Sequence, residues 1–193
     1  MNQTTKTFIY ITLGMGALVL IANKIFGSKA TKNPYNSGRN LVVGDSHGVM
    51  IGAKIKNGKA DALLSKSGWN VSNVINALNS YPISPDVSNI FISIGTNGGY
   101  NKNDKIEQLV TQLKEKFPNA YLYAFKGSYG WSGKWENSRA AQDLIPYYER
   151  FANMGVIILN NGLGYFSTDA GAHSTTSSQA KAIINEINSY TSN

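Results

Sequence analysis

The chain has 193 residues, of which 42% are hydrophobic, and this length suits one domain with a hydrophobic core plus a short extension. It contains no cysteine, which excludes disulfides, thiol catalysis and thiolate metal ligands. Its two histidines, His47 and His173, are too few for the usual multi-histidine zinc site, so we expect neither a metal ion nor a cofactor.

The net charge of +7 is spread unevenly along the sequence. Four of the 18 basic residues, and none of the 11 acidic ones, fall within residues 1–33, so the remaining chain is only weakly basic. This distribution favours contact of the N-terminal region with an anionic membrane surface, and it argues against a nucleic-acid partner.

The first predicted element is an apolar segment at the N-terminus. Residues 7–23 carry no charge, and if Lys24 extends its amine toward the headgroups the segment reaches residue 26, about 30 Å of helix. We therefore predict one transmembrane helix within residues 1–26 that anchors the protein in membrane lipid. A cleaved signal peptide is the alternative, although no small-x-small cleavage site follows the apolar run. Positive charges flank the segment on both sides, so the side of the membrane stays open.

Residues 27–39 are rich in Gly, Ser, Asn and Pro and are typical of a linker, and residues 40–193 form the predicted globular domain. In this domain short apolar runs alternate with amphipathic helical patterns. The runs predicted as strands are 40–44, 60–65, 89–94, 120–125 and 155–159. The predicted helices are one that begins at Ser46, 71–78, 104–117, 138–153, and one from Thr176 onward, where Thr176 and Gln179 form a capping-box pattern.

This alternation indicates a parallel sheet covered by helices on both faces, because several of the strands are apolar throughout. We predict an α/β fold, a three-layer α/β/α sandwich of the flavodoxin-like kind with five parallel strands. In such sheets ligands bind at the carboxyl ends of the strands, so the residues that follow each strand are the candidates for a site.

Polar and glycine-rich segments follow three of the predicted strands. Gly44-Asp45-Ser46-His47-Gly48 follows the first, Gly95-Thr96-Asn97-Gly98-Gly99 follows the third, and the segment after the fifth contains Asp169 and His173. A serine on a turn between a strand and a helix exposes its hydroxyl near the helix N-terminus, where negative charge is stabilised. We predict Ser46 as a nucleophile, His173 as the base that removes its proton, and Asp169 as the acid that orients His173.

These residues resemble the SGNH, or GDSL-like, hydrolase family, and the resemblance covers residues 40–190. Four short blocks carry it by their order and spacing: Gly44-Asp45-Ser46, Ser67-Gly68-Trp69, Gly95-Thr96-Asn97, and Asp169 with His173. The resemblance implies the SGNH fold, a nucleophilic Ser46, and an oxyanion hole formed by the N–H groups of Ser46 and Gly68 and the side-chain amide of Asn97.

The sequence departs from the family pattern at two places. Three residues separate Asp169 from His173, where the family usually has two, so a small bulge or a differently placed acid is needed to restore their hydrogen bond. Gly98 follows Asn97, where the family commonly has an acid. We expect this second change to matter less, because the oxyanion donor itself is present.

Each candidate also has a structural interpretation. Ser46 is a common type of helix N-cap, Asn97 next to two glycines is a common type of turn residue, and Gly68 fits a position of close packing. His173 has the alternative of a surface loop residue. We assign His47 to structure or to the wall of the pocket.

An aromatic and basic stretch lies between residues 121 and 148. Its glycine-rich middle, residues 126–137, follows a strand and is expected to overhang the site. Its aromatic side chains have three interpretations: stacking surfaces for sugar rings, a stacking platform for nucleic acid, which the weakly basic domain disfavours, or packing that holds a long loop to the domain. These side chains are Tyr123, Phe125, Tyr129, Trp131, Trp135 and Tyr147.

The sequence thus predicts a membrane-anchored serine esterase that hydrolyses acyl esters of a glycan or a lipid, with acetyl groups favoured, through an acyl-enzyme. The competing hypothesis is a non-catalytic binding or structural module of a cell envelope or virion, on the same fold with a disturbed triad. This second hypothesis is motivated by the three residues between Asp169 and His173, one more than the family usually has. The natural substrate, the kind of membrane and the oligomeric state stay open.

Overall fold

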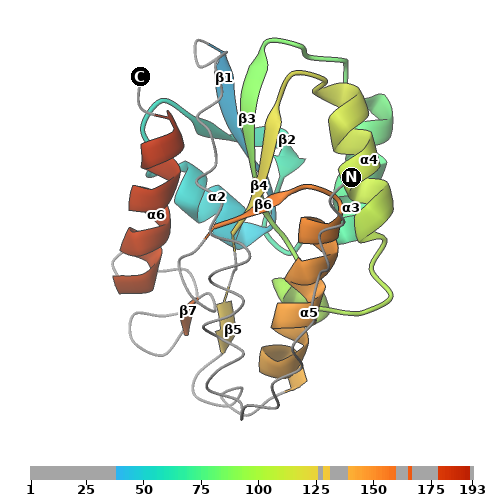
Figure 1. The fold of residues 1–193 in the computed structure, drawn as a ribbon, viewed down its shortest axis with the longest axis vertical. Coiled ribbons are helices and arrows are strands. Elements are labelled where there is room, and N and C mark those ends of the chain that lie inside the picture. The colour runs from blue at the N-terminus through green and yellow to red at the C-terminus, as the bar shows by residue number, and fades with distance from the viewer. Residues whose placement is uncertain (1–37, 126–127, 131–138, 160–164, 167–177, 192–193) are drawn as a thin grey trace, which may run out of the picture. The chain divides into compact units, whose positions relative to one another are not determined.

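The computed structural model describes residues 38–125, 128–130, 139–159, 165–166 and 178–191 (Figure 1). The predicted transmembrane helix lies outside these residues, as does the predicted linker up to residue 37. In the part of the chain that the structure describes, no helix is both long enough and apolar enough to cross a bilayer.

Five strands form one parallel sheet, as predicted. They are β1 (Arg39–Gly44), β2 (Lys59–Ser65), β3 (Val87–Ser93), β4 (Tyr121–Ala124) and β6 (Ile157–Ile158), and their order in the sheet is β2-β1-β3-β4-β6. The register of β1 and β3 places Gly44 opposite Ser93 at their carboxyl ends. The chain therefore enters β1 at Arg39 on the amino edge of the sheet and leaves it at the carboxyl edge, beside Ser46.

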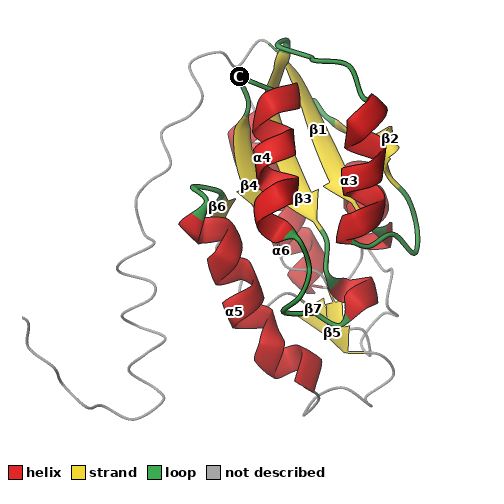
Figure 2. Ribbon diagram, turned by 90° about the vertical axis from the view of Figure 1, so that its right-hand side faces the viewer, coloured by secondary structure: helices red, strands yellow, loops and turns green. Residues whose placement is uncertain are grey.

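Helices cover both faces of this sheet and complete the predicted three-layer sandwich (Figures 1 and 2). They are α2 (Ser46–Gly52), α3 (Val71–Ser80), α4 (Ile106–Lys116), α5 (Arg139–Asn153) and α6 (Ser178–Thr191). The helices α2 and α6 lie on one face, and α3, α4 and α5 lie on the other. Each begins within two residues of its predicted start, and α3, α4 and α5 also end within two residues of their predicted ends.

The two faces have separate hydrophobic cores, because successive side chains of a strand point to opposite sides. In β1, Leu41 and Val43 pack with α3, α4 and α5, whereas Val42 packs with Ile51 of α2 and Ile183 of α6. All five side chains are fully buried. A strand that is covered on both faces has to be apolar on both, which explains why β1 is a continuous apolar run in the sequence.

The sequence does not predict a second, two-stranded sheet, which the structure contains. Its strands, β5 (Ser128–Gly130) and β7 (Tyr165–Phe166), pair in parallel, and both lie beyond the carboxyl edge of the main sheet (Figures 1 and 2). Strands this short show no alternating pattern, so they carry no periodic signal. The small sheet brings residues from before and after α5 to the edge where the candidate site is expected.

The topology identifies where a ligand is expected to bind. From β1 the chain continues into α2 on one face, and from β3 it continues toward α4 on the other face. In open parallel sheets, ligands bind outside the carboxyl ends of two neighbouring strands that send the chain to opposite faces. Ser46 follows β1 at this point, and Asn97 follows β3.

Candidate active site

The turn after β1 requires glycine at its first position. Gly44 has a φ of +137°, and a Cβ atom placed there would lie 1.7 Å from the main-chain oxygen of Ser93 in the neighbouring strand. Any side chain would therefore push β1 away from β3. This close approach of two strands explains the glycine of the Gly44-Asp45-Ser46 block.

Asp45, and not Ser46, is the N-cap of α2. The carboxylate oxygen Oδ1 of Asp45 accepts hydrogen bonds from the main-chain N–H groups of His47 (3.0 Å) and Gly48 (3.4 Å) and from Ser93 Oγ (3.2 Å). The interpretation of Ser46 as a helix cap is therefore wrong, because Ser46 is the first residue of the helix itself. The sequence alone does not separate the two residues, since aspartate and serine are equally good N-caps.

Burial perturbs the carboxyl group of Asp45. The side chain is fully buried, and among the described residues its Oδ2 atom has no hydrogen-bond partner. Desolvation raises the pKa of Asp45 to about 7, although the hydrogen bonds from Gly48, His47 and Ser93 act in the opposite direction. Asp45 thus titrates near neutral pH directly beside the candidate nucleophile.

Ser46 lies in the first turn of α2 with 9% of its surface exposed. The N-terminal end of a helix supplies positive potential to a developing oxyanion, so this position is compatible with a nucleophilic serine. The adjacent His47 is fully buried, which agrees with the assignment of His47 to structure.

Gly68 lies on the turn that follows β2. Its φ is +81°, and apart from its chain neighbours no atom of the described residues lies within 4 Å of the place of a Cβ atom. No described residue packs closely against Gly68, and its backbone conformation alone is a reason for glycine at this position. The turn is joined to the end of β1, because the N–H of Lys66 donates to the carbonyl of Gly44 over 3.1 Å.

Asn97 lies in a short 3-10 helix, η1 (Thr96–Gly98), that follows β3. The flanking glycines Gly95 and Gly99 have φ values of +112° and +63°, so the chain turns sharply here. The Asn97 side chain is exposed, and its Nδ2 donates to the main-chain oxygen of Trp69 over 2.9 Å. A carboxamide has two N–H donors, and this bond uses one of them. Asn97 is thus a turn residue that also links the third block to the second.

Three of the four blocks meet at one edge of the sheet. Main-chain hydrogen bonds join the first block to β3 and to the turn after β2, and the Asn97 side chain joins that turn to the loop after β3. The candidate oxyanion donors of Ser46, Gly68 and Asn97 therefore lie on turns that are bonded to one another.

The fourth block lies outside the described residues. This applies to Asp169 and His173, and also to Thr176 of the predicted capping box. The hydrogen bonds from Ser46 to His173 and from His173 to Asp169 therefore stay a prediction. The nearest described strand is β7, which ends at Phe166.

The described residues contain no candidate metal site, since no three His, Asp or Glu side chains among them are placed to hold an ion. Of the two histidines, His47 is buried beside Ser46 and His173 lies outside the described residues. The expectation that neither a metal ion nor a cofactor takes part stays a prediction.

The aromatic stretch divides into two parts. Tyr123, Phe125 and Tyr147 are buried in the domain, so for these three side chains the packing interpretation is correct and the stacking interpretation is wrong. Residues 131–138, with both tryptophans of the stretch, lie outside the described residues, and of Tyr129 the structure describes the backbone in β5. Stacking stays a prediction for these aromatic residues.

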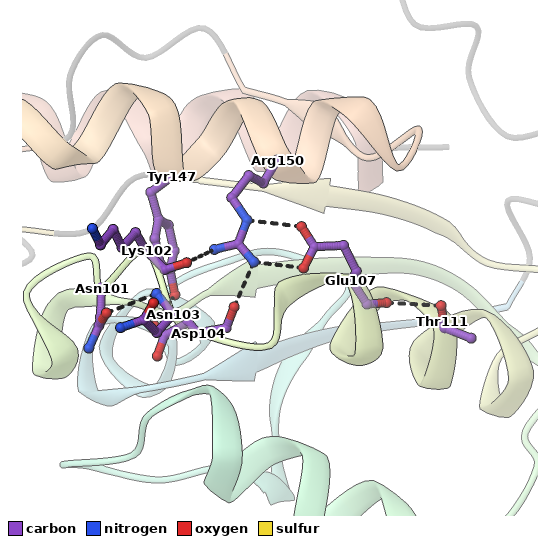
Figure 3. Close-up of polar contacts among 8 residues, drawn as sticks. All are labelled: Asn101, Lys102, Asn103, Asp104, Glu107, Thr111, Tyr147 and Arg150. Atoms are coloured by element: carbon purple, nitrogen blue, oxygen red, sulfur yellow. Dashed lines mark hydrogen bonds and ion pairs between the residues drawn. The ribbon is translucent and has the colours of Figure 1, made fainter.

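Two residues of α5 that the sequence does not single out hold this edge together. The hydroxyl of Tyr148 donates to the carbonyls of Ile94 (3.2 Å) and Phe125 (3.0 Å), the residues that follow β3 and β4. Arg150 donates to main-chain carbonyls of the loop after β3 (Figure 3). The helical pattern of α5 predicts a buried and an exposed face, but nothing in it marks which polar groups reach a neighbouring loop.

The fold is similar to those of several solved structures, among them an aryl esterase and a phospholipase. An aryl esterase from M. smegmatis gives a TM-score of 0.55 at 12% sequence identity, over 80% of this chain and 100% of that one. Phospholipase A1 from Streptomyces albidoflavus NA297 gives a TM-score of 0.51 at 13% identity, over 64% of this chain and 79% of that one. No family model matches the sequence, and no curated protein matches it. At these identities the likeness establishes the α/β sandwich fold, and the activity has to be argued from the site.

Proposed function

We propose that this protein is a membrane-anchored serine esterase of the SGNH type. The observation that carries the proposal is the meeting of the turns that hold Ser46, Gly68 and Asn97, at the place where open parallel sheets bind ligands. Two proteins of similar fold are described as an aryl esterase and a phospholipase A1, which supports an ester as the substrate.

In the proposed reaction, the hydroxyl of Ser46 attacks the carbonyl carbon of an ester while His173 accepts the hydroxyl proton. The carbonyl oxygen becomes an oxyanion that accepts hydrogen bonds from the N–H groups of Ser46 and Gly68 and from Asn97 Nδ2. Collapse of the tetrahedral intermediate expels the alcohol, which takes the proton from His173, and leaves the acyl group on Ser46. Water then releases the carboxylic acid by the same steps, with Asp169 orienting His173 throughout.

The position of β7 supports the parts assigned to Asp169 and His173. β7 ends at Phe166, beyond the carboxyl edge of the main sheet and three residues before Asp169. The segment that contains both residues therefore starts from the edge that holds Ser46. The proposal requires a ring nitrogen of His173 within about 2.6–3.2 Å of the serine oxygen, and the other nitrogen equally close to a carboxylate.

Covalent labelling tests the nucleophile. A fluorophosphonate probe should label the full-length protein, which should also hydrolyse p-nitrophenyl acetate. Ser46→Ala should abolish labelling and lower kcat/KM at least about 1,000-fold, and His173→Ala should have a comparable effect on turnover because the two residues act as a unit. The matched control is Ser80→Ala, at an exposed serine that ends α3, and it should leave both readouts unchanged. Folded protein that is not labelled would contradict the proposal and favour a non-catalytic module of a cell envelope or virion.

We further propose that the ester belongs to an acylated glycan or lipid and that acetyl is the favoured acyl group. The support is the aromatic, glycine-rich stretch of residues 126–137, which begins after β4 at the carboxyl edge of the sheet. A panel of acetylated sugars and p-nitrophenyl esters of increasing chain length separates the alternatives. Faster turnover of long-chain esters than of acetyl esters would contradict the preference for acetyl.

The proposed membrane anchor comprises residues 7–26. Its support is the uncharged run of residues 7–23, long enough with the residues up to 26 to span a bilayer. The full-length protein should stay with membranes after a carbonate wash and should be released by detergent. Determination of the mature N-terminus distinguishes the cleaved signal peptide, because cleavage would remove these residues.

A further inference from the structure

The loop that carries Asn97 is folded by its own hydrogen bonds. The carbonyl of Gly95 accepts from the N–H groups of Gly98 (3.1 Å) and Tyr100 (2.9 Å), and Asp104 N–H donates to the carbonyl of Asn101 (3.0 Å). These bonds give the loop a defined shape. They do not fix its place relative to the sheet, which depends on the contacts that the loop makes with other elements.

Arg150 of α5 makes several polar contacts at the far end of this loop (Figure 3). Its Nη1 donates to the carbonyl of Lys102 over 2.9 Å, and its Nη2 donates to the carbonyl of Asp104 over 2.6 Å. The same guanidinium forms a two-point ion pair with the carboxylate of Glu107, at 2.9 Å from Nε and 2.6 Å from Nη2. One side chain thus joins α5 to the loop and to the first turn of α4.

Two tyrosines of α5 contact the same loop. The ring of Tyr147 lies against Gly95, where a Cβ atom would be 2.7 Å from the ring, and the Tyr147 hydroxyl donates to Asp104 Oδ2 over 2.7 Å. The Tyr148 hydroxyl donates to the carbonyl of Ile94 at the start of the loop. The two ends of the loop are therefore held by one helix, with Asn97 between them.

We infer that Arg150 is a positioning residue for the proposed ester hydrolysis, holding the loop after β3 so that the Asn97 amide meets the oxyanion. This inference rests on the proposed function. The ion pair alone would explain little, because 26% of the Arg150 side chain and 54% of the Glu107 side chain are exposed, and such pairs contribute weakly. The two bonds to main-chain carbonyls tie the end of the loop near Lys102 and Asp104 to α5, in addition to the contacts of Tyr147 and Tyr148. They need the rigid fork of a guanidinium, which lysine cannot reproduce.

Substitution of Arg150 tests this role through the split between kcat and KM. A displacement of about 1 Å at a reacting group costs on the order of 100-fold in rate, so Arg150→Gln should lower kcat about 10- to 100-fold in the full-length enzyme, with KM changed less than about twofold. Arg150→Lys should recover little of the loss. Thermal unfolding checks that both variants fold. If Arg150→Gln does not fold, kcat and KM are compared between Arg150→Lys and the wild type instead.

Two control variants separate the loop contacts from the ion pair. Glu107→Gln removes the charge of the partner but leaves the bonds from Arg150 to the carbonyls of Lys102 and Asp104, so kcat should stay within about threefold of the wild type. Arg39→Gln is the matched substitution, because Arg39 forms a similar two-point pair with Asp86 at the opposite edge of the sheet. It should leave kcat unchanged. A loss of kcat in Arg39→Gln equal to that in Arg150→Gln would overturn the inference.

A double-mutant cycle with Asn97 decides whether Arg150 acts through that amide. Asn97→Ala should lower kcat about 100- to 1,000-fold, and adding Arg150→Gln should then cause little further loss. Losses that multiply would overturn the inference, since they would place the effect of Arg150 elsewhere.

Hydrogen exchange gives a readout that does not depend on activity. The amides of Gly98, Tyr100 and Asp104 should exchange at least about tenfold faster in Arg150→Gln, and at the wild-type rate in Arg39→Gln. Wild-type protein without esterase activity would overturn the proposed function. Active wild type together with unchanged kcat or unchanged exchange in Arg150→Gln would overturn only the positioning role.

Discussion

The turn after β1 and the loop after β3 are held in different ways, although both carry groups of the candidate site. The turn after β1 is fixed from within the sheet, because Gly44 lies against the main chain of Ser93. In addition, the buried carboxylate of Asp45 accepts hydrogen bonds from the N-terminus of α2 and from Ser93 of β3. The loop after β3 is fixed from outside, by Tyr148 and Arg150 of α5.

This difference separates the candidate nucleophile from the candidate oxyanion amide. Ser46 follows a turn that is packed against β3 and hydrogen-bonded to it, so changes around Ser46 should act mainly on folding. The exposed Asn97 lies on a loop that α5 holds at both ends and that is also bonded to Trp69 after β2, so changes in α5 should act on turnover with a smaller loss of stability.

Replacing Asp45 by asparagine should give the largest effect, and one that depends on pH. In the folded protein, burial raises the pKa of Asp45 to about 7, whereas in the unfolded chain it is about 4. Between these values the folded state keeps a proton that the unfolded state has lost, so the stability is complete below about pH 4 and falls as the pH rises toward 7. Asparagine cannot ionise. The free energy of unfolding of the wild type should therefore fall, relative to that of Asp45→Asn, by on the order of 4 kcal/mol across this window.

Urea unfolding of both proteins at about pH 4, 6 and 8 measures this difference. Because all other titrating groups are common to the two proteins, their effects cancel in the comparison. Parallel stability profiles would mean that Asp45 keeps an ordinary pKa in the folded state.

The next largest effect should come from Gly44→Ala. Its methyl group would meet the main-chain oxygen of Ser93 at 1.7 Å, and the positive φ adds strain, so we expect a loss of about 3 kcal/mol or more. Gly68→Ala is the matched control, since its φ is also positive but the space around it is open. It should cost about 1–2 kcal/mol. Equal losses, measured by urea unfolding, would mean that the strands can separate without cost at Gly44.

Tyr148→Phe should have the smallest effect on stability of these substitutions. It should lower turnover, whereas the comparable substitution Tyr81→Phe should not. The change at Tyr148 removes a buried hydroxyl that donates to the carbonyls of Ile94 and Phe125, which should cost about 1–2 kcal/mol. Tyr81→Phe removes a comparable buried bond, from the Tyr81 hydroxyl to Asp61 Oδ2 at 2.7 Å, and should cost a similar amount. Only the change at Tyr148 should lower kcat, because Ile94 begins the loop that carries Asn97. If both variants keep the wild-type kcat, α5 does not control the loop through Tyr148.

The architecture was predictable because its signals are local. The apolar run from Leu41 to Val43 predicts a strand covered on both faces, and glycines and polar residues directly after the strands predict the edge that holds the site. The two-stranded sheet of β5 and β7 was not predictable, because strands of two and three residues leave no pattern.

The position of the site was predictable, whereas the contacts that hold its residues in place were less so. The spacing of the blocks places Ser46, Gly68 and Asn97 after neighbouring strands. It does not show that Asp45 caps α2, because the cap depends on which side chain turns inward. The contacts of α5 are also hidden, since they join residues far apart in the sequence: 54 positions separate Tyr148 from Ile94.

The path of β1 has a practical consequence for how the protein can be handled. β1 begins at Arg39 and ends beside Ser46, so its six residues carry the chain about 20 Å from one edge of the sheet to the other. A resin, a fluorescent label or a carrier protein joined just ahead of Arg39 would meet the domain at its amino edge. Small molecules would still reach Ser46 from the opposite side.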